Sequence, residues 1–278
     1  MYRTDLAIEA HQQHLQQDAA LQGVEVVQTQ KEQILMTEVT ITTPDAAEQL
    51  GKPMGRYITL ELESLVQHSV SIPEPAARML GEQLLRLVPD GPVLVVGLGN
   101  AAVTPDAVGP RTLEHLLVTR HLRQFMPDTF GDLRACCAFA PGVLGATGME
   151  SAGMVRSVAA LSGAASLIVV DALAACEEKR LCTTVQLADT GIIPGSGIGN
   201  SRAAFNRQTM GVPVIAVGVP TVIRAEVLRQ EKKPGDLIVT PSDIDQRVAA
   251  LAKMIGMGIN RALFPELKPE ELAELTMR

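Results

Sequence analysis

Two aspartates follow strongly apolar runs, and their side chains could carry out acid–base chemistry. Asp106 lies in Thr104-Pro105-Asp106-Ala107, shortly after the apolar run 93–96, and Asp171 directly follows the apolar run 167–170. Two carboxyl groups held close together cannot both ionise easily, so one keeps its proton as an acid while the other acts as a base on water. Hydrolysis of a peptide bond needs both functions. The pair therefore predicts a hydrolase in which Asp106 and Asp171 are catalytic.

A structural role explains each aspartate equally well when it is taken alone. Aspartate is common in turns and at helix N-termini, and a helical pattern is expected after both residues. Two such residues at neighbouring strand ends favour catalysis over capping. No Ser/His/Asp or Cys/His set competes with them, and no HExxH metal motif is present.

The apolar runs before the two aspartates are typical of strands buried on both faces of a parallel sheet. Ligands of such sheets bind beyond the carboxyl ends of the strands, where both aspartates are expected. Strand and helix patterns alternate along the chain. The expected elements are helix 76–87, strand 93–96, helix 112–126, strand 135–140, helix 150–161, strand 166–170, a helical turn at 172–178, strands 185–187 and 214–219, and helix 242–263.

This alternation predicts an α/β fold of three layers, with a mainly parallel sheet and helices on both faces. Residues 22–63 instead alternate apolar and polar side chains, which predicts a region of antiparallel strands leading into the main domain. Residues 4–20 are polar and rich in Gln, as in a frayed helix or an extended arm. One large α/β domain is as compatible with the length of the chain as two small ones.

A glycine-rich segment is the third candidate for function. Four glycines and one proline fall within residues 189–200, which predicts a loop whose backbone N–H groups can approach a ligand closely. The candidate residues are Gly191, Gly195, Ser196, Gly197 and Asn200. Asp189-Thr190-Gly191 is similar to the triplet of pepsin-like proteases, but the β-rich bilobal pattern around it is missing, so Asp189 is interpreted as a turn residue or a secondary site candidate. Gly97 and Gly99 are better explained by a tight turn than by phosphate binding.

Composition limits the possible partners. The 278 residues carry a net charge of −7, which argues against a surface that binds nucleic acid. Four cysteines without a CxxC pattern indicate small buried side chains in a reducing compartment. The N-terminus lacks the features of a signal peptide and no apolar run approaches 18 residues, so we expect a soluble intracellular protein without a membrane partner.

These segments together resemble one family, the spore germination proteases, which degrade small acid-soluble spore proteins when a bacterial spore germinates. The similar segments occur in family order and span nearly the whole chain. They are residues 3–10, 55–57, 95–100, 103–107, 119–122, 141–143, 171–175 and 191–200.

The resemblance implies properties that spacing and composition do not show. It implies a phosphorylase/hydrolase-like fold similar to that of the hydrogenase maturation proteases, a homotetramer, and a location in the cytoplasm of the forespore and the spore core. It also implies that Asp106 and Asp171 are the catalytic pair of an aspartic-type endopeptidase without a cofactor. The expected substrates are small acid-soluble spore proteins.

The family is made as a zymogen that removes its own propeptide, cutting after an acidic residue and before an apolar residue that is followed by Ala. Asp5-Leu6-Ala7 fits this preference, so residues 1–5 are the expected propeptide and 6–278 the protease domain. Tyr2 replaces the acidic residue favoured four places before the bond, and the loop at 222–240 is shorter than in longer members. Two alternatives stay open: a metal-dependent endopeptidase that uses the same carboxylates, and a non-catalytic binding protein.

Overall fold

A mixed β-sheet runs through the whole molecule. The structure is a computed structural model that describes residues 2–16, 21–63, 74–199, 202–229 and 237–276. In this part of the chain nine strands form one sheet in the order β1-β2-β3-β7-β8-β6-β4-β5, and β9 pairs with β8. The strands are β1 (Val24–Lys31), β2 (Ile34–Ile41), β3 (Gly55–Glu61), β4 (Val93–Gly97), β5 (Cys136–Phe139), β6 (Ser166–Ala175), β7 (Thr184–Ala188), β8 (Val214–Arg224) and β9 (Ile238–Val239).

The sheet has a parallel part and an antiparallel part. Strands β5, β4, β6 and β8 run parallel to one another, whereas β8, β7, β3, β2 and β1 are joined by antiparallel pairings. The antiparallel region expected at 22–63 is therefore confirmed as β1 to β3. Strands β4, β6 and β8 are almost entirely buried, because their apolar residues face helices on both sides of the sheet.

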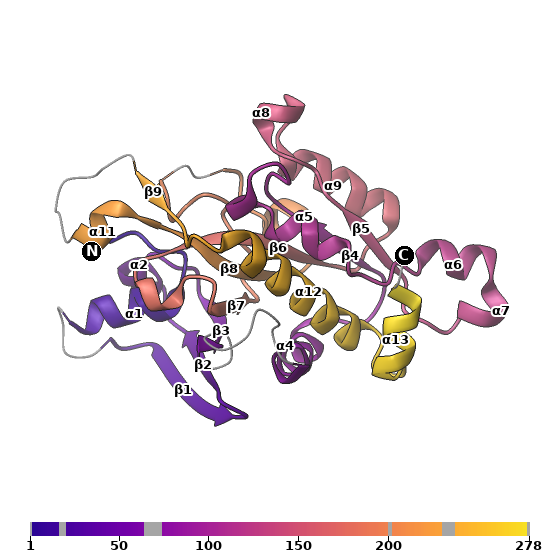
Figure 1. Cartoon of the computed structure of the whole chain (residues 1–278), viewed down its shortest axis with the longest axis horizontal. Coiled ribbons are helices and arrows are strands. Elements are labelled where there is room, and N and C mark those ends of the chain that lie inside the picture. Colours follow the sequence, from indigo (N-terminus) through magenta and orange to yellow (C-terminus); the bar gives the residue numbers. More distant parts are fainter. Residues whose placement is uncertain (1, 17–20, 64–73, 200–201, 230–236, 277–278) are drawn as a thin grey trace.

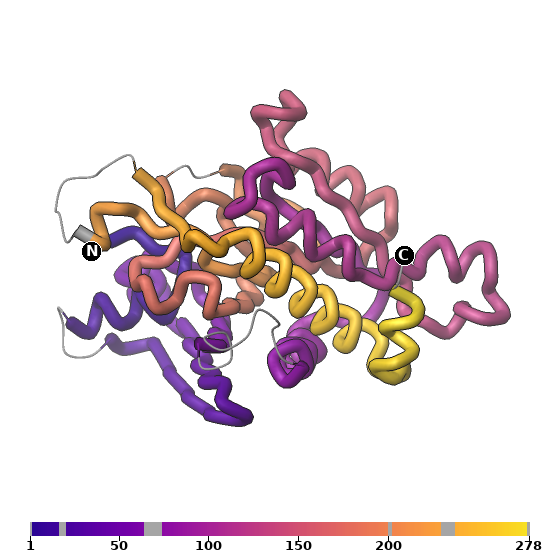
Figure 2. The backbone as a smooth tube through the Cα atoms, viewed as in Figure 1, coloured from indigo at the N-terminus to yellow at the C-terminus, as the bar shows by residue number. Residues whose placement is uncertain are grey.

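Helices cover both faces of the sheet, which confirms the expected α/β class (Figure 1). Helices α4 (Glu74–Leu87), α5 (Val108–Leu113) and α12 (Ile244–Leu263) pack on one face, and α12 runs diagonally across the middle of the molecule (Figure 2). Helices α1 (Ala7–Leu15), α2 (Pro44–Leu50), α9 (Ser151–Ser162) and α10 (Arg207–Met210) pack on the other. The remaining elements are η1 (Thr104–Asp106), α6 (Arg120–Phe125), α7 (Pro127–Phe130), α8 (Leu144–Thr147), η2 (Glu178–Arg180), α11 (Ala225–Arg229) and α13 (Pro269–Thr276).

The helix expected at 112–126 is wrong, because two short helices with an extended link replace it. Leu117 N–H donates to the buried Oδ1 of Asn260 at 2.9 Å, and Thr119 N–H donates to the carbonyl oxygen of Cys136 at 3.1 Å. These bonds from α12 and β5 satisfy the backbone of the link. Tertiary partners thus outweigh the local helical pattern.

The helical turn expected at 172–178 is also wrong. Strand β6 continues to Ala175, because β8 supplies ladder partners as far as Ile223, with a bulge between Leu173 and Ala174. Residues 178–180 do form a turn of helix, η2. Asp171 therefore lies inside a strand and cannot be a helix cap, which removes the capping explanation for this residue.

The N-terminal segment is packed into the molecule and is not a free arm. Leu6 and Ala7 are fully buried, and Ile8 and Ala10 are nearly so. Helix α1 contacts β2, β3 and α2. No helix in the described part of the chain is long and apolar enough to cross a membrane.

Candidate active site

Asp106 is placed by the glycine turn at the end of β4. Gly99 has φ +107°, and a Cβ atom on it would lie 2.0 Å from the carbonyl oxygen of Asp106. Only glycine allows this backbone conformation and this close approach. Asn100 N–H then donates to Asp106 Oδ2 at 2.8 Å. The turn therefore folds Asp106 back over the carboxyl end of the strand.

Asp171 lies one strand away, at the same end of the sheet. Gly97, the last residue of β4, pairs with Val170, so Asp171 is the next residue beyond this pair. Side chains alternate along a strand, which places Asp171 on the face of Leu167 and Val169, towards α9. Its side chain is 4% exposed, and Ala172 N–H donates to Asp171 Oδ1 at 2.9 Å.

The two carboxyl groups line one cavity of about 520 Å³. Burial raises the pKa of Asp106, and the hydrogen bond from Asn100 N–H opposes this shift. The pKa of Asp171 is raised well above its ordinary value, first by burial and then by the negative charges of Asp106 and Asp5. The site can therefore retain a proton at a pH where an ordinary carboxyl group has lost it.

Asp5 brings a third carboxyl group to this cavity. Its backbone pairs with β6, since Asp5 N–H donates to the carbonyl oxygen of Ala174 at 3.0 Å. Its side chain accepts hydrogen bonds from Ala174 N–H, at 2.9 Å from Oδ2, and from the Ser196 hydroxyl, at 2.5 Å from Oδ1. The residue before the expected processing bond thus lines the same cavity as Asp106 and Asp171.

The backbone on both sides of Asp5–Leu6 is held by two polar side chains. Lys52 Nζ donates to the carbonyl oxygens of Thr4 and Asp5, at 2.9 and 3.0 Å. Gln186 Nε2 donates to the Asp5 carbonyl at 3.2 Å, while its Oε1 accepts from Ala7 N–H at 2.7 Å. Sequence reasoning missed Lys52 and Gln186, because a lysine after a helix-ending glycine and a glutamine inside a strand carry no motif.

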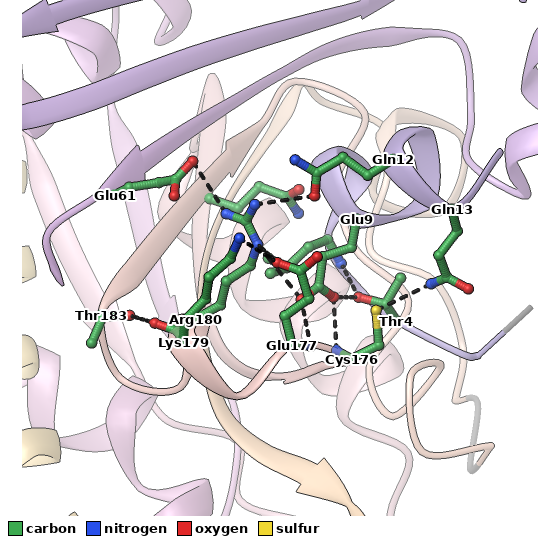
Figure 3. A network of polar contacts seen from close by, with 12 residues as sticks. Thr4, Glu9, Gln12, Gln13, Glu61, Cys176, Glu177, Lys179, Arg180 and Thr183 are labelled. Carbon is green, nitrogen blue, oxygen red and sulfur yellow. Dashed lines mark hydrogen bonds and ion pairs between the residues drawn. The ribbon is translucent and has the colours of Figure 1, made fainter. Parts of the chain in front are cut away.

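A buried ionic network holds the start of α1, which follows the Asp5–Leu6 bond in the chain (Figure 3). Glu9, which is 0% exposed, accepts from the backbone N–H groups of Cys176 and Glu177, at 2.8 and 2.9 Å, and from the Thr4 hydroxyl. Arg180 is also buried and lies 3.7 Å from Glu9, 3.2 Å from Glu61 and 3.1 Å from Glu177. The residues on both sides of Asp5 are therefore tied to the chain that follows β6.

Residues of the glycine-rich segment 189–200 line the cavities around Asp5. Gly195 lines the cavity of Asp106 and Asp171, whereas Gly191 and Ser196 line a neighbouring cavity of about 600 Å³ that also receives Lys52. A Cβ atom on Gly197 would lie 2.4 Å from Asp5 Oδ2, so this glycine allows the close approach of Asp5. Asn200 lies outside the described residues.

Asp189 has a structural role. Its Oδ1 accepts from Arg56 N–H at 2.8 Å, and its own N–H donates to the Arg56 carbonyl at 3.2 Å. Asp189 lines neither of the two cavities. These contacts favour the interpretation of Asp189 as a turn residue over that as a secondary site candidate.

The described residues contain no group of three or more His, Cys, Asp or Glu side chains arranged to hold a metal ion. The three carboxylates around the cavity are therefore not a preformed metal centre in this structure.

Comparison with known proteins identifies the family. The germination protease family matches residues 2–233. The chain belongs to the germination protease family. The germination protease of Caldanaerobacter subterraneus subsp. tengcongensis is 38% identical, with 98% of this chain and 97% of that protein covered. That of Clostridium tetani is 35% identical over 97% of this chain and 98% of its own length, and that of Bacillus thuringiensis subsp. konkukian is 40% identical over 80% and 63%.

Among solved structures, a nickel–iron hydrogenase maturation protease from Thermococcus kodakarensis matches 64% of this chain and 98% of its own, with 16% identity and a TM-score of 0.38. Membership of the germination protease family makes the chain a peptidase related to spore germination.

Proposed function

We propose that this protein is an aspartic-type endopeptidase that starts the degradation of small acid-soluble spore proteins, with Asp106 and Asp171 as its acid–base pair. One observation carries the proposal. Both carboxyl groups line the cavity that also receives Asp5, the acidic residue of the chain's own Asp5-Leu6-Ala7 segment. The acidic residue of a substrate-like segment therefore shares a cavity with the two residues that could cleave it.

The environments of the two carboxyl groups support different roles. Asp171 is the more deeply buried and its pKa is raised the more strongly, so it holds the shared proton and gives it to the leaving nitrogen. Asp106, which is half-buried, accepts a proton from water. The water oxygen forms a bond to the carbonyl carbon, the C–N bond breaks, and the new amine and carboxyl groups leave.

The first substrate is the chain itself. Cleavage of Asp5–Leu6 would release residues 1–5 and convert a zymogen into the active enzyme. The hydrogen bonds of Lys52 and Gln186 to the Asp5 carbonyl support this step, because they hold the bond in one orientation.

The location and the assembly belong to the same proposal. The substrates would be met in the cytoplasm of the forespore and the spore core, and the enzyme would be a homotetramer. The edge strand β1 supports assembly, since its Val26 and Val27 side chains are 41% and 60% exposed. Light scattering coupled to size-exclusion chromatography tests it: a mass near 29.6 kDa at working concentration contradicts a tetramer.

Substitution of either aspartate by asparagine tests the mechanism. Asp106→Asn and Asp171→Asn should each reduce cleavage of a small acid-soluble spore protein by about 10²–10⁴-fold, the usual cost of removing a general acid or base. Both variants should also keep residues 1–5, as mass spectrometry would show. Asp189→Asn is the matched control, because its amide oxygen can still accept from Arg56 N–H.

The same experiment separates the alternatives. Full activity in either asparagine variant excludes the two-carboxylate mechanism. Activity that is lost with a chelator and returns with a divalent metal identifies the metal-dependent alternative. Binding of the spore protein without any cleavage by the parent chain identifies a non-catalytic binding protein.

A further inference from the structure

The row of residues Asp171, Gly218 and Gln186 crosses three neighbouring strands. Asp171 of β6 pairs with Gly218 of β8, and Gly218 pairs with Gln186 of β7. All three belong to the sheet face that is covered by α1 and α9, since their chain neighbours Val170, Val217 and Leu187 are in the core on the opposite face. Asp171 and Gln186 are therefore separated by one residue that has no side chain.

The space above Gly218 is taken by a neighbouring side chain, since a Cβ atom on Gly218 would lie 2.3 Å from Leu173 Cδ1. Gly218 lines the cavity that also receives Asp5, Lys52 and Gln186. Asp5 in turn lines the cavity of Asp171 as well. Asp5 thus lines two cavities, one with Asp106 and Asp171 and the other with Gln186 and Lys52.

The donors on the second side converge on one atom. Lys52 Nζ and Gln186 Nε2 both donate to the Asp5 carbonyl oxygen, at 3.0 and 3.2 Å. Gln186 is 6% exposed, and its Oε1 is fixed by Ala7 N–H. Burial lowers the pKa of Lys52, and the negative charges of Asp5 and Glu9 oppose that shift. An ammonium group and an amide group are therefore held in a protected site and aimed at a single peptide oxygen.

We propose that Lys52, assisted by Gln186, is a catalytic residue that stabilises the negative charge on the carbonyl oxygen of the bond being cleaved. This inference rests on the proposed endopeptidase function. When water adds to the carbonyl carbon, the electron pair of the C=O bond moves to the oxygen, which accepts stronger hydrogen bonds from Lys52 and Gln186. When the C–N bond breaks, the C=O bond forms again and the proton of Asp171 goes to the leaving nitrogen.

The same groups would serve substrates other than the chain itself. Once residues 1–5 have left, Lys52 Nζ, Ala174 N–H and the Ser196 hydroxyl lose the Asp5 acceptors that they now contact. Buried donors without an acceptor are costly. A peptide with an acidic side chain before the cleaved bond supplies both the carbonyl oxygen and the carboxylate that these donors need.

Lys52→Met tests the proposal, because methionine retains much of the length of the side chain and removes the charge. The Lys52→Met protein is expressed as the full chain. If it does not remove residues 1–5 by itself, a trace of tagged parent enzyme is added to cleave them and is then removed. On a peptide with an Asp–Leu bond, kcat should fall about 10²–10³-fold, as for the loss of one donor to an oxyanion. KM should rise about tenfold, because Lys52 also contacts the carbonyl oxygen before the reaction. Lys52→Arg should recover part of the rate. Lys253→Met, at an exposed position of α12, is the control.

The overturning result is a processed Lys52→Met enzyme with kcat within twofold of the parent. That result would mean that Lys52 only fastens the N-terminal segment before processing. Equal loss of the rate in the Lys253→Met control would contradict the proposal as well.

A binding measurement separates this inference from the proposed function. In processed chains that carry Asp171→Asn, an Asp–Leu peptide is compared with the same peptide in which an E-alkene replaces the amide and removes the oxygen. With Lys52 present the amide peptide should bind about tenfold or more tightly than the alkene, and Lys52→Met should abolish the difference. If the parent chain with Asp171 fails to cleave the peptide while the Asp171→Asn chains show this binding pattern, the enzyme function is refuted and the Lys52 contact is not. Equal binding of both peptides by the chain with Lys52, or no binding of either, overturns the contact.

Discussion

At the scale of single residues, the buried carboxyl group of Asp171 should lower the free energy of unfolding at neutral pH, relative to a protein without an ionisable group at this position. Because the folded-state pKa of this carboxyl group lies well above the ordinary value of 3.8, the native state binds the proton more tightly than the unfolded state does. Its contribution to stability is fully present below pH 3.8 and is lost as the pH rises through the raised pKa. Asp171→Asn cannot ionise, so it should raise Tm at pH 7, by about 2–4 °C per kcal/mol of relieved cost, and the gain should shrink towards pH 4.

Asp243 provides a control of opposite sign for that measurement. The hydrogen bond from Arg247 lowers the pKa of the Asp243 carboxyl group. Its contribution to stability is therefore present above the ordinary pKa and is lost as the pH falls. Asp243→Asn should slightly lower Tm at pH 7. A lower Tm for Asp171→Asn at pH 7 would contradict the burial argument.

The pH profile of cleavage should reflect the same carboxyl groups. Both Asp106 and Asp171 have a raised pKa, so the shared proton is lost only as the pH rises through these raised values. Above that range no acid remains for the leaving nitrogen, and kcat should fall. Steady-state cleavage of an Asp–Leu peptide between pH 4 and pH 9 measures the profile. A rate that keeps increasing to pH 9 would exclude a carboxylic acid as proton donor.

At the scale of elements, the turn after β4 decides where Asp106 lies. Gly99→Ala would place a Cβ atom 2.0 Å from the Asp106 carbonyl oxygen at φ +107°, so the turn has to move. We expect a loss of roughly 1–3 kcal/mol in the free energy of unfolding, together with a larger loss of activity than that destabilisation explains. Urea unfolding and peptide cleavage measure the two effects.

Gly153→Ala in α9 is the matched control for Gly99→Ala. No atom lies within 4 Å of a Cβ built on Gly153, and alanine in a helix interior is more favourable than glycine by roughly 0.5–1 kcal/mol. This variant should be neutral or slightly more stable and fully active. Normal activity in Gly99→Ala would show that the turn does not position Asp106.

Strand β6 shows why local patterns predicted most elements but not all. Residues 167–170 are apolar and three of them are β-branched, which indicates a strand without help from the rest of the chain. The following Ala172-Leu173-Ala174-Ala175 favours a helix by intrinsic propensity. The pairing with β8 and the bond from Asp5 N–H keep it extended. These partners are distant in sequence, so no local pattern contains them.

At the scale of the whole molecule, Glu9 connects the N-terminal segment to the rest of the structure. Glu9→Ala should lower the free energy of unfolding by roughly 3–5 kcal/mol, because it leaves buried backbone donors and part of the charge of Arg180 without a partner. Hydrogen exchange of residues 7–15 should accelerate. Glu25→Ala, at an exposed position of β1, is the control and should change little. Unchanged exchange in Glu9→Ala would contradict the anchoring role.

The sequence by itself determined the α/β class, the antiparallel start and the choice of Asp106 and Asp171, because apolar runs, alternation and glycine turns act over a few residues. Only the tertiary structure decided that Asp171 lies inside a strand, that Asp5 reaches the same cavity, and that Lys52 and Gln186 hold the carbonyl oxygen of Asp5. Those contacts join residues that lie 47 to 181 positions apart. Their spacing follows from the order of the strands in the sheet, which a local pattern does not specify.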